Sequence, residues 1–429
     1  LVGSEMCIRD RLLLKKGSGI LKQKQTLWTK NFTIITLGTI ISCIGGVAMN
    51  FALSFVVFDN SKSTLLMGIF SAISMIPTVI LPIVISPYLD RFKRKPVIVG
   101  LDFLNGLLYL CFGFFILKAG FDFQIYLLFS FSTSAIGTIY QQAYTSYYPN
   151  LIPKGFAQKG YTVSSMIYPS VSVLITPVAA FLYKQYGMAF IVFLEGISLL
   201  VASFFESRID YVEEVHGEGK FNWNAYKNNF LEGIRFLKKE KGLQKIYMYM
   251  PITQGISEGT SSLVIAYFQT TPALGIAMYS MFTVVEFIGR TMGGIVHYKV
   301  EIPKEKRFMI SMLVYYSYAV MDAVLLFSAY PLMLVNRAVC GFLGINSATL
   351  RESSVQNYIP DENRAKLNAF FNVAYSMVSI VFRLLVGALG EVMDYRICLA
   401  IFALFQICCC YWIMQRNKEC IKPIYNQTY

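Results

Sequence analysis

The chain repeats two short patterns at the same spacing, about half its length apart. The segment SPYLDRFKRKP, residues 86–96, aligns with GGIVHYKVEIP, residues 293–303. The segment NLIPKGFAQK, which begins at Asn150, aligns with NYIPDENRAK, which begins at Asn357, and both alignments share an offset of 207 residues. A repeat of this length is far longer than a solenoid unit. In an apolar chain it predicts two homologous helical bundles placed side by side in a membrane.

The composition predicts a lipid environment. Of the 429 residues, 55% are hydrophobic and 15% are charged, which leaves too few polar residues to cover a soluble globule of this size. A bilayer core of about 30 Å needs about 20 apolar residues per helix. The fold class predicted on this rule is an all-α membrane protein with twelve transmembrane helices in two pseudo-symmetric six-helix bundles. The predicted spans are residues 32–58, 65–85, 96–117, 124–147, 161–183, 188–206, 244–268, 273–297, 308–328, 331–350, 367–389 and 396–414.

The predicted domain organisation follows from these spans. Residues 1–11 (LVGSEMCIRDR) resemble the translation of a sequencing-library adapter, so we expect them to be an assembly artefact. The remaining parts are a cytoplasmic N-terminus at 12–31, the first bundle at 32–206, a cytoplasmic linker at 207–243, the second bundle at 244–414 and a cytoplasmic tail at 415–429. Apolar residues recur at helical spacing in the linker, which predicts an amphipathic helix on the membrane surface, with target recognition as the alternative. These residues are Trp223, Tyr226, Phe230, Ile234 and Leu237.

The distribution of basic residues predicts the orientation in the membrane. Lys and Arg concentrate at the termini and in the connections after even-numbered spans, and such residues are retained on the cytoplasmic side. The opposite side has only Lys62, Lys118, Lys184 and Arg396. Both termini are therefore predicted to be cytoplasmic in a bacterial cytoplasmic membrane. The net charge of +13 is accounted for by this asymmetry and by anionic lipid, so we expect no nucleic-acid partner.

Several kinds of chemistry lack the residues that they need. The chain has two histidines, His216 and His297, which gives no basis for a histidine-ligated metal or a Ser/His triad. The cysteines lie mostly in apolar spans without metal-ligand spacing. No phosphate-binding loop of the GxxxxGK[ST] kind occurs. We therefore expect no metal, no cofactor, no enzymatic activity and no direct use of ATP.

Together these features resemble the major facilitator superfamily. The family places a basic motif, G-x-L-a-D-R-x-G-R-[RK], between its second and third spans, and the residues that match it here are Asp90, Arg91, Arg94 and Lys95. Ser86 and Lys93 replace the two glycines of the motif. In the second half His297 stands where the aspartate would be, so the resemblance implies two unequal gates. It covers nearly the whole chain, from about Leu27 to Met414.

The resemblance implies a cytoplasmic gate. A carboxylate at a helix end can accept hydrogen bonds from the free amides at the start of another helix. For Asp90, the family implies that this partner is the start of the eleventh span, near residues 366–368. Arg91 and Arg94 could pair across the two halves or with Asp102, and so hold the cytoplasmic side shut. The alternative is that the motif serves only as a positively charged cytoplasmic anchor.

Ionisable and polar residues within the spans are candidates for the transport site. An unpaired charge in hydrocarbon costs at least about 2.5 kcal/mol. The candidates for binding substrate or carrying a proton are Asn50, Gln142, Glu258, Glu286, Arg337 and Arg383. Glu258 could alternate between a protonated and an ion-paired form. The alternative is a set of static ion pairs, such as Glu286 with Arg290 four residues later.

The function predicted from the sequence is secondary active transport by alternating access. We expect proton-coupled efflux of a small organic or drug-like solute by a monomer in the lipid bilayer. The fourth span lacks the arginine that many proton-coupled exporters of the family keep there. Import of a small nutrient and a nontransporting membrane sensor of the same fold are the alternatives.

Overall fold

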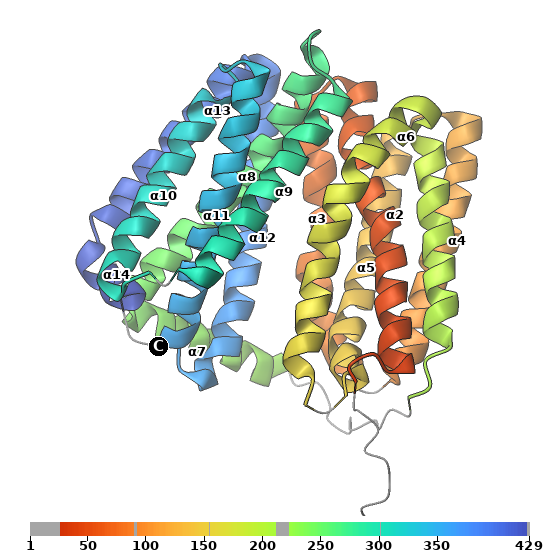
Figure 1. Ribbon diagram of the computed structural model, residues 1–429, viewed down its shortest axis with the longest axis horizontal. Coiled ribbons are helices and arrows are strands. Elements are labelled where there is room, and N and C mark those ends of the chain that lie inside the picture. The colour runs from red at the N-terminus through yellow and green to blue at the C-terminus, as the bar shows by residue number, and fades with distance from the viewer. Residues whose placement is uncertain (1–25, 90–91, 154, 212–222, 301, 427–429) are drawn as a thin grey trace, which may run out of the picture.

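The computed structural model describes residues 26–89, 92–153, 155–211, 223–300 and 302–426. These residues form helices and short connections, and no strand occurs among them. Two groups of helices stand side by side, with the helices of each group roughly aligned (Figure 1). The segment 1–11, predicted to be an artefact, lies outside the described residues.

The first group contains five long helical elements, and one of them covers two predicted spans. Their bounds are α2 Lys30–Ser61, α3 Thr64–Leu89, α4 Arg94–Ala119, α5 Phe123–Leu151 and α6 Ala157–Ser207. A kink at Gly187 divides α6, where the backbone adopts a φ of 77°. Only glycine takes this left-handed conformation without a steric cost. The helix therefore changes direction at a residue between the predicted spans 161–183 and 188–206.

The second group follows the linker helix α7 Trp223–Lys239. Its elements are α8 Lys241–Thr270, α9 Ile276–Lys299, α10 Lys304–Leu325, α11 Tyr330–Tyr358, α12 Asp361–Val392, α13 Tyr395–Cys409, the π-helix η1 Cys410–Gln415 and α14 Lys418–Tyr425. The last helix, α14, lies in the predicted cytoplasmic tail. Its residues Ile421, Ile424 and Tyr425 are buried against the bundle. This segment is therefore folded onto the second half.

Seven helices of the described chain are long and apolar enough to cross a membrane, namely α2, α3, α4, α6, α10, α12 and α13 with η1. The long helices α5, α8, α9 and α11 are not among them, although each overlaps a predicted span. These four contribute polar or charged side chains to the internal cavities of the bundle. The number of twelve spans stays a prediction.

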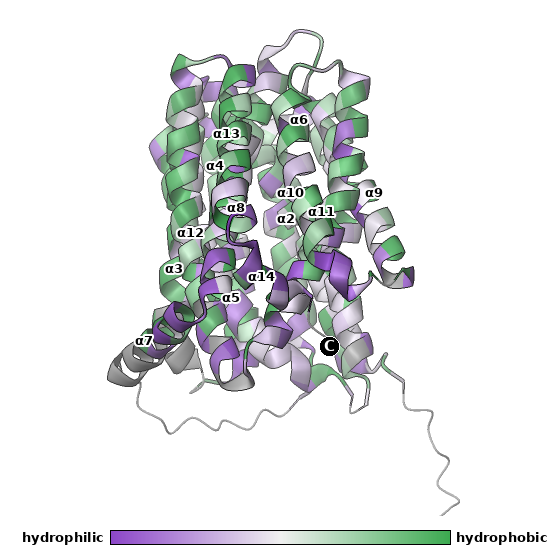
Figure 2. Cartoon of the chain, turned by 90° about the vertical axis from the view of Figure 1, so that its left-hand side faces the viewer, coloured by the Kyte–Doolittle hydropathy of each residue, from purple (hydrophilic) through white to green (hydrophobic). Residues whose placement is uncertain are grey.

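The outward surface of the bundle is apolar. Leu128, Leu174 and Leu313 are 66%, 69% and 66% exposed, and many other large apolar side chains are exposed with them. Hydrophobic residues follow the long helices, whereas hydrophilic residues gather at the end where α7 and α14 lie (Figure 2). A soluble monomer rarely exposes so much contiguous apolar surface. Lipid chains are the environment that suits this surface.

The two halves contact each other closely through α3 and α12. A Cβ atom on Gly68 would clash with the carbonyl oxygen of Arg383, and one on Gly387 would lie 2.7 Å from that of Thr64. We call the side that holds the starts of α2 and α8 the termini face, and the side that holds the starts of α3 and α13 the opposite face. The two groups of helices converge toward the opposite face and diverge toward the termini face (Figure 1).

The linker helix α7 is attached to the second half. Lys366 Nζ at the start of α12 donates a hydrogen bond to Glu232 Oε2 at 2.7 Å. A Cβ atom on Gly233 would lie 3.3 Å from the Lys366 side chain, so the two helices pack tightly here. Leu237 is buried in the same apolar cluster as Ile246 of α8. The helix α7 therefore packs on the second half, and its location at the membrane surface stays a prediction.

This attachment predicts a pH dependence for α7. The hydrogen bond and the positive charge of Lys366 lower the pKa of Glu232 below its ordinary value of 4.5. A lowered pKa stabilises the folded state above pH 4.5, and that contribution is lost as the pH falls through the folded-state value. We expect residues 231–239 to exchange their amide hydrogens faster at pH 3 than at pH 6, after correction for the intrinsic rates. Lys366→Gln should remove this difference and Lys238→Gln should keep it; equal protection of the native protein at both pH values would contradict the prediction.

Candidate transport site

Internal cavities lie within the second half and between the two halves. A cavity of about 300 Å³ and one of about 220 Å³ share four lining residues, so they adjoin each other within the second half. The shared residues are Ser257, Arg290, Tyr318 and Asp322. A third cavity of about 510 Å³ lies between the halves and is lined by Asn50 and Glu195 from one half and Arg383 from the other. Cavities of this size suit a small organic solute.

Glu258 and Arg383 form an ion pair between α8 and α12. The Glu258 side chain is 41% exposed and that of Arg383 is 21% exposed, and Tyr375 donates a further hydrogen bond to Glu258 Oε1 at 3.3 Å. The two helices approach closely because Gly255 and Gly259 flank Glu258; a Cβ on Gly259 would lie 2.8 Å from a carbonyl oxygen of α12. Glu258 faces the 220 Å³ cavity and Arg383 the 510 Å³ cavity. The pair therefore joins the two parts of the interior.

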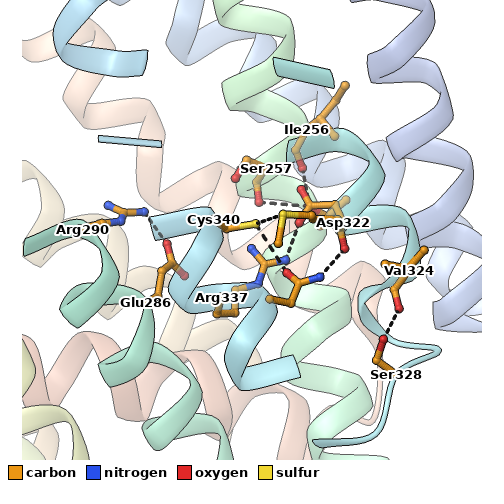
Figure 3. Close-up of polar contacts among 12 residues, drawn as sticks. Ile256, Ser257, Glu286, Arg290, Asp322, Val324, Ser328, Arg337 and Cys340 are labelled. Atoms are coloured by element: carbon orange, nitrogen blue, oxygen red, sulfur yellow. Dashed lines mark hydrogen bonds and ion pairs between the residues drawn. The ribbon is translucent and has the colours of Figure 1, made fainter. Parts of the chain in front are cut away.

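A second ion pair, between Asp322 of α10 and Arg337 of α11, is more deeply buried. The side chains are 14% and 10% exposed, and the Arg337 guanidinium also lies 5.3 Å from the centre of the Phe282 ring. Next to it, Asn336 donates a hydrogen bond to the Met321 carbonyl oxygen at 2.8 Å. Figure 3 shows Arg337 directed at Asp322 from the neighbouring helix. These contacts fix both charged groups between helices.

The third predicted pair lies along a single helix. Arg290 of α9 donates to Glu286 Oε1 at 2.5 Å, one turn earlier, as Figure 3 also shows. Arg290 is 51% exposed and Glu286 is 20% exposed. Both line the cavities of the second half. The structure thus brings Glu258, Glu286 and Arg337 to one cavity, while Arg383 lies on its border.

The first half contributes polar groups of another kind. Asn50 lines the cavity between the halves, whereas Gln142 of α5 is half-buried and lines none of these three cavities. Glu195 of α6 is 5% exposed, and its Oε2 has no hydrogen-bond partner among the described residues. Glu206, also on α6, is fully buried and accepts a hydrogen bond from the Tyr140 hydroxyl at 2.7 Å.

The structure describes only part of the predicted gate motif, since Asp90 and Arg91 lie outside the described residues. Arg94 is half-buried at the start of α4. Lys95 Nζ donates to the Ile209 carbonyl oxygen at 2.5 Å, a contact within the first half. Asp102 is 4% exposed, and its Oδ2 has no hydrogen-bond partner in the described part of the chain. The gate role of these residues stays a prediction.

A carboxylate that closes the opposite face was missed from the sequence. Glu391, at the end of α12, accepts hydrogen bonds through Oε1 from the amide of Leu65 at 2.9 Å and the hydroxyl of Ser63 at 2.6 Å. The Thr64 hydroxyl donates to the Gly387 carbonyl oxygen at 2.8 Å. Glu391 thus accepts hydrogen bonds from the N-terminus of a helix in the other half. The sequence predicts a contact of this kind for Asp90, but at the termini face. In the sequence, the signal for this role is that Glu391 follows directly after the apolar run of the eleventh span.

These contacts indicate a membrane protein with a polar interior that is closed at the opposite face. Among the described residues, no group of three His, Cys, Asp or Glu side chains could hold a metal ion. A bundle of this kind is typical of membrane transporters. The family model described as Major Facilitator Superfamily matches residues 35–321, more than half of the chain. The chain belongs to this family and is a multi-pass membrane transporter rather than an enzyme.

Individual proteins show the same relationship. An uncharacterized MFS-type transporter of Bacillus subtilis, YkuC, is 24% identical over 228 residues, which cover 51% of this chain and 52% of YkuC. The chain thus matches about half the length of this curated relative. The crystal structure of the nucleoside transporter NupG aligns with a TM-score of 0.69 and 11% identity, over 90% of this chain and 99% of NupG. A POT family transporter with a bound thioalcohol-conjugated peptide aligns with a TM-score of 0.69 and 10% identity, over 91% and 96%. These two structures show the shared fold.

Proposed function

We propose that this transporter is a proton-coupled secondary carrier that moves a small organic solute out of a bacterial cell. It works as a monomer in the cytoplasmic membrane, with both termini in the cytoplasm and with no nucleic-acid partner. The termini face is then the cytoplasmic face, and the closed opposite face is directed outward. Rocking of the two halves about the cavities would expose the solute to each side in turn.

The observation that carries this proposal is the ion pair between Glu258 and Arg383. The pair is electrically neutral, so it is tolerated at depth in the membrane. A proton on Glu258 would remove its negative charge and leave Arg383 without its partner. Arg383 borders the cavity between the halves, so this loss of pairing acts where α12 packs against α3. Protonation would thereby be coupled to the contact that closes the opposite face.

The test is a solute screen in proteoliposomes with an imposed proton gradient. The native protein should show solute-dependent flux that collapses with the gradient. Glu258→Gln cannot release or take up a proton, so we expect gradient-driven flux to fall at least about a hundredfold while exchange of solute without a gradient persists. Glu419→Gln removes a carboxylate from the exposed surface of α14 and should behave as the native protein. Unchanged gradient-driven flux in Glu258→Gln would remove this residue from the proton path.

Import is the alternative direction, because the same ion pair and cavities can serve either one. Inverted vesicles separate the two, since an exporter accumulates solute in them when their interior is acidic and an importer depletes it. A nontransporting sensor would show no flux in either orientation, and that result would overturn the proposal.

A further inference from the structure

One arginine in the cavity of the second half has no partner among the described residues. We propose that the transported solute is an organic anion and that Arg351 of α11 binds its carboxylate or phosphate group. This inference rests on the proposed function, because it names the class of solute for the same transport site. Arg351 lines the 300 Å³ cavity and is half-buried. In the part of the chain that the structure describes, no hydrogen bond or ion pair joins Arg351 to another group.

The positive charge of Arg351 is not balanced by a negative charge in the cavity lining. Three ion pairs line or border the second-half cavities, and the charges within each pair cancel. These pairs are Arg290 with Glu286, Arg337 with Asp322, and Arg383 with Glu258. Arg351 therefore adds one surplus positive charge to this lining. An uncompensated charge at depth in a membrane protein is costly, and an anionic solute would supply the missing negative charge.

The depth of Arg351 distinguishes it from a surface anchor. Helix α11 continues to Tyr358, so Arg351 lies about 10 Å inside the helix end at about 1.5 Å per residue. Ser347, one turn earlier on the same face, lines the same cavity and is 2% exposed. Its hydroxyl oxygen has no hydrogen-bond partner among the described residues. An arginine and a free hydroxyl donor therefore occupy adjacent turns of one cavity wall.

The rest of this wall suits the body of an organic molecule. Tyr249, Tyr315 and Tyr318 line the cavity together with Met250, and Gln254 adds a side-chain amide. Aromatic rings bind apolar and aromatic groups at a low entropic cost. The guanidinium fork of an arginine matches the two oxygens of a carboxylate or phosphate. The site therefore fits a small molecule with an aromatic or apolar body and one anionic group.

The test measures equilibrium binding to the purified full-length protein in detergent, without any gradient. The probes are the matched set benzoate, benzyl alcohol and benzylamine, and the pair glucose 6-phosphate and glucose, each followed by calorimetry and by thermal unfolding. We expect at least one anion to bind the native protein while its neutral and cationic counterparts do not. Arg351→Gln should weaken that binding tenfold or more, because it removes charge-assisted hydrogen bonds. Arg416→Gln, the same change at an exposed arginine of the termini face, should bind with the native affinity.

Three results would overturn the inference. These are equal binding of neutral or cationic probes, native affinity in Arg351→Gln, and no anion-selective binding of any probe to the native protein. If Arg351→Gln does not fold, Arg351→Lys is measured in its place. This variant keeps the positive charge but lacks the bidentate fork of arginine, so it should bind the anion more weakly than the native protein. Binding is measured without a gradient, so failure of the proton-coupling proposal would be seen in flux alone and failure of this inference in binding.

Discussion

Arg337→Gln is expected to destabilise the protein by about 3–5 kcal/mol, more than the loss of any other single ion pair in the second half. The substitution leaves the carboxylate of Asp322 buried and without its partner, and removing one member of a buried pair has a cost of this size. It also removes the contact between the guanidinium and the Phe282 ring. Equilibrium unfolding in mixed detergent micelles, followed by intrinsic fluorescence, measures the change.

Two further variants separate the pairing from other effects of the substitution. In the double variant Asp322→Asn with Arg337→Gln no charge remains, so most of the lost stability should return. Arg290→Gln breaks an ion pair whose arginine is 51% exposed, and such pairs along a helix contribute only about 0.3–0.5 kcal/mol. An equal loss of stability in Arg290→Gln and Arg337→Gln would contradict this prediction. It would show that the burial of the pair between Asp322 and Arg337 has no energetic consequence.

Gly387→Leu is expected to stop the opposite face from closing. The first atom of the new side chain would lie 2.7 Å from the Thr64 carbonyl oxygen, where α12 crosses α3. Overpacking of this kind costs about 1–3 kcal/mol, and it penalises only the state in which the two helices touch. The population of that state should fall about five- to 150-fold relative to states open at this face.

Accessibility of a cavity residue measures this shift. Asn50 lines the cavity between the halves, so Asn50→Cys, in a variant without other cysteines, reports which face is open. With Gly387→Leu, an impermeant maleimide added at the opposite face should label this cysteine at least about five times faster, and solute flux should fall. Gly100→Leu adds the same volume on α4, where no atom lies within 4 Å of the new Cβ, and should change neither rate. Slow labelling in both variants would contradict the gating role of this contact.

The sequence predicts the helices well because apolar run length has a direct physical cause in the thickness of the bilayer. The predicted span 65–85 lies within α3 and the span 367–389 lies within α12. The helix ends are less predictable, since polar residues can extend a helix beyond the apolar run. Helix α11 runs to Tyr358, although its apolar span ends at residue 350. For this reason Arg351 is only an orientation signal in the sequence, whereas the structure places it in a cavity wall.

The pairing of charges could not be predicted from spacing alone, apart from the pair within α9. Glu286 and Arg290 are four residues apart, so helix geometry suffices to bring them together. Glu258 and Arg383 are 125 residues apart, and they meet because two glycines let α8 approach α12. The closure of the opposite face by Glu391 depends on how the two halves rest against each other. This arrangement is a property of the assembled bundle and not of any single segment.

The polarity of α5, α8, α9 and α11 has a consequence for biogenesis. A charged residue near the centre of a segment raises the free energy of its entry from the translocon into lipid by about 2.5–3.5 kcal/mol. Helix α9 contains both members of its ion pair, Glu286 and Arg290. Helix α8 contains Glu258, and its partner Arg383 on α12 is synthesised much later. These segments should therefore insert cooperatively with later ones. A nascent chain that stops before α12 would hold Glu258 in the membrane without its partner Arg383.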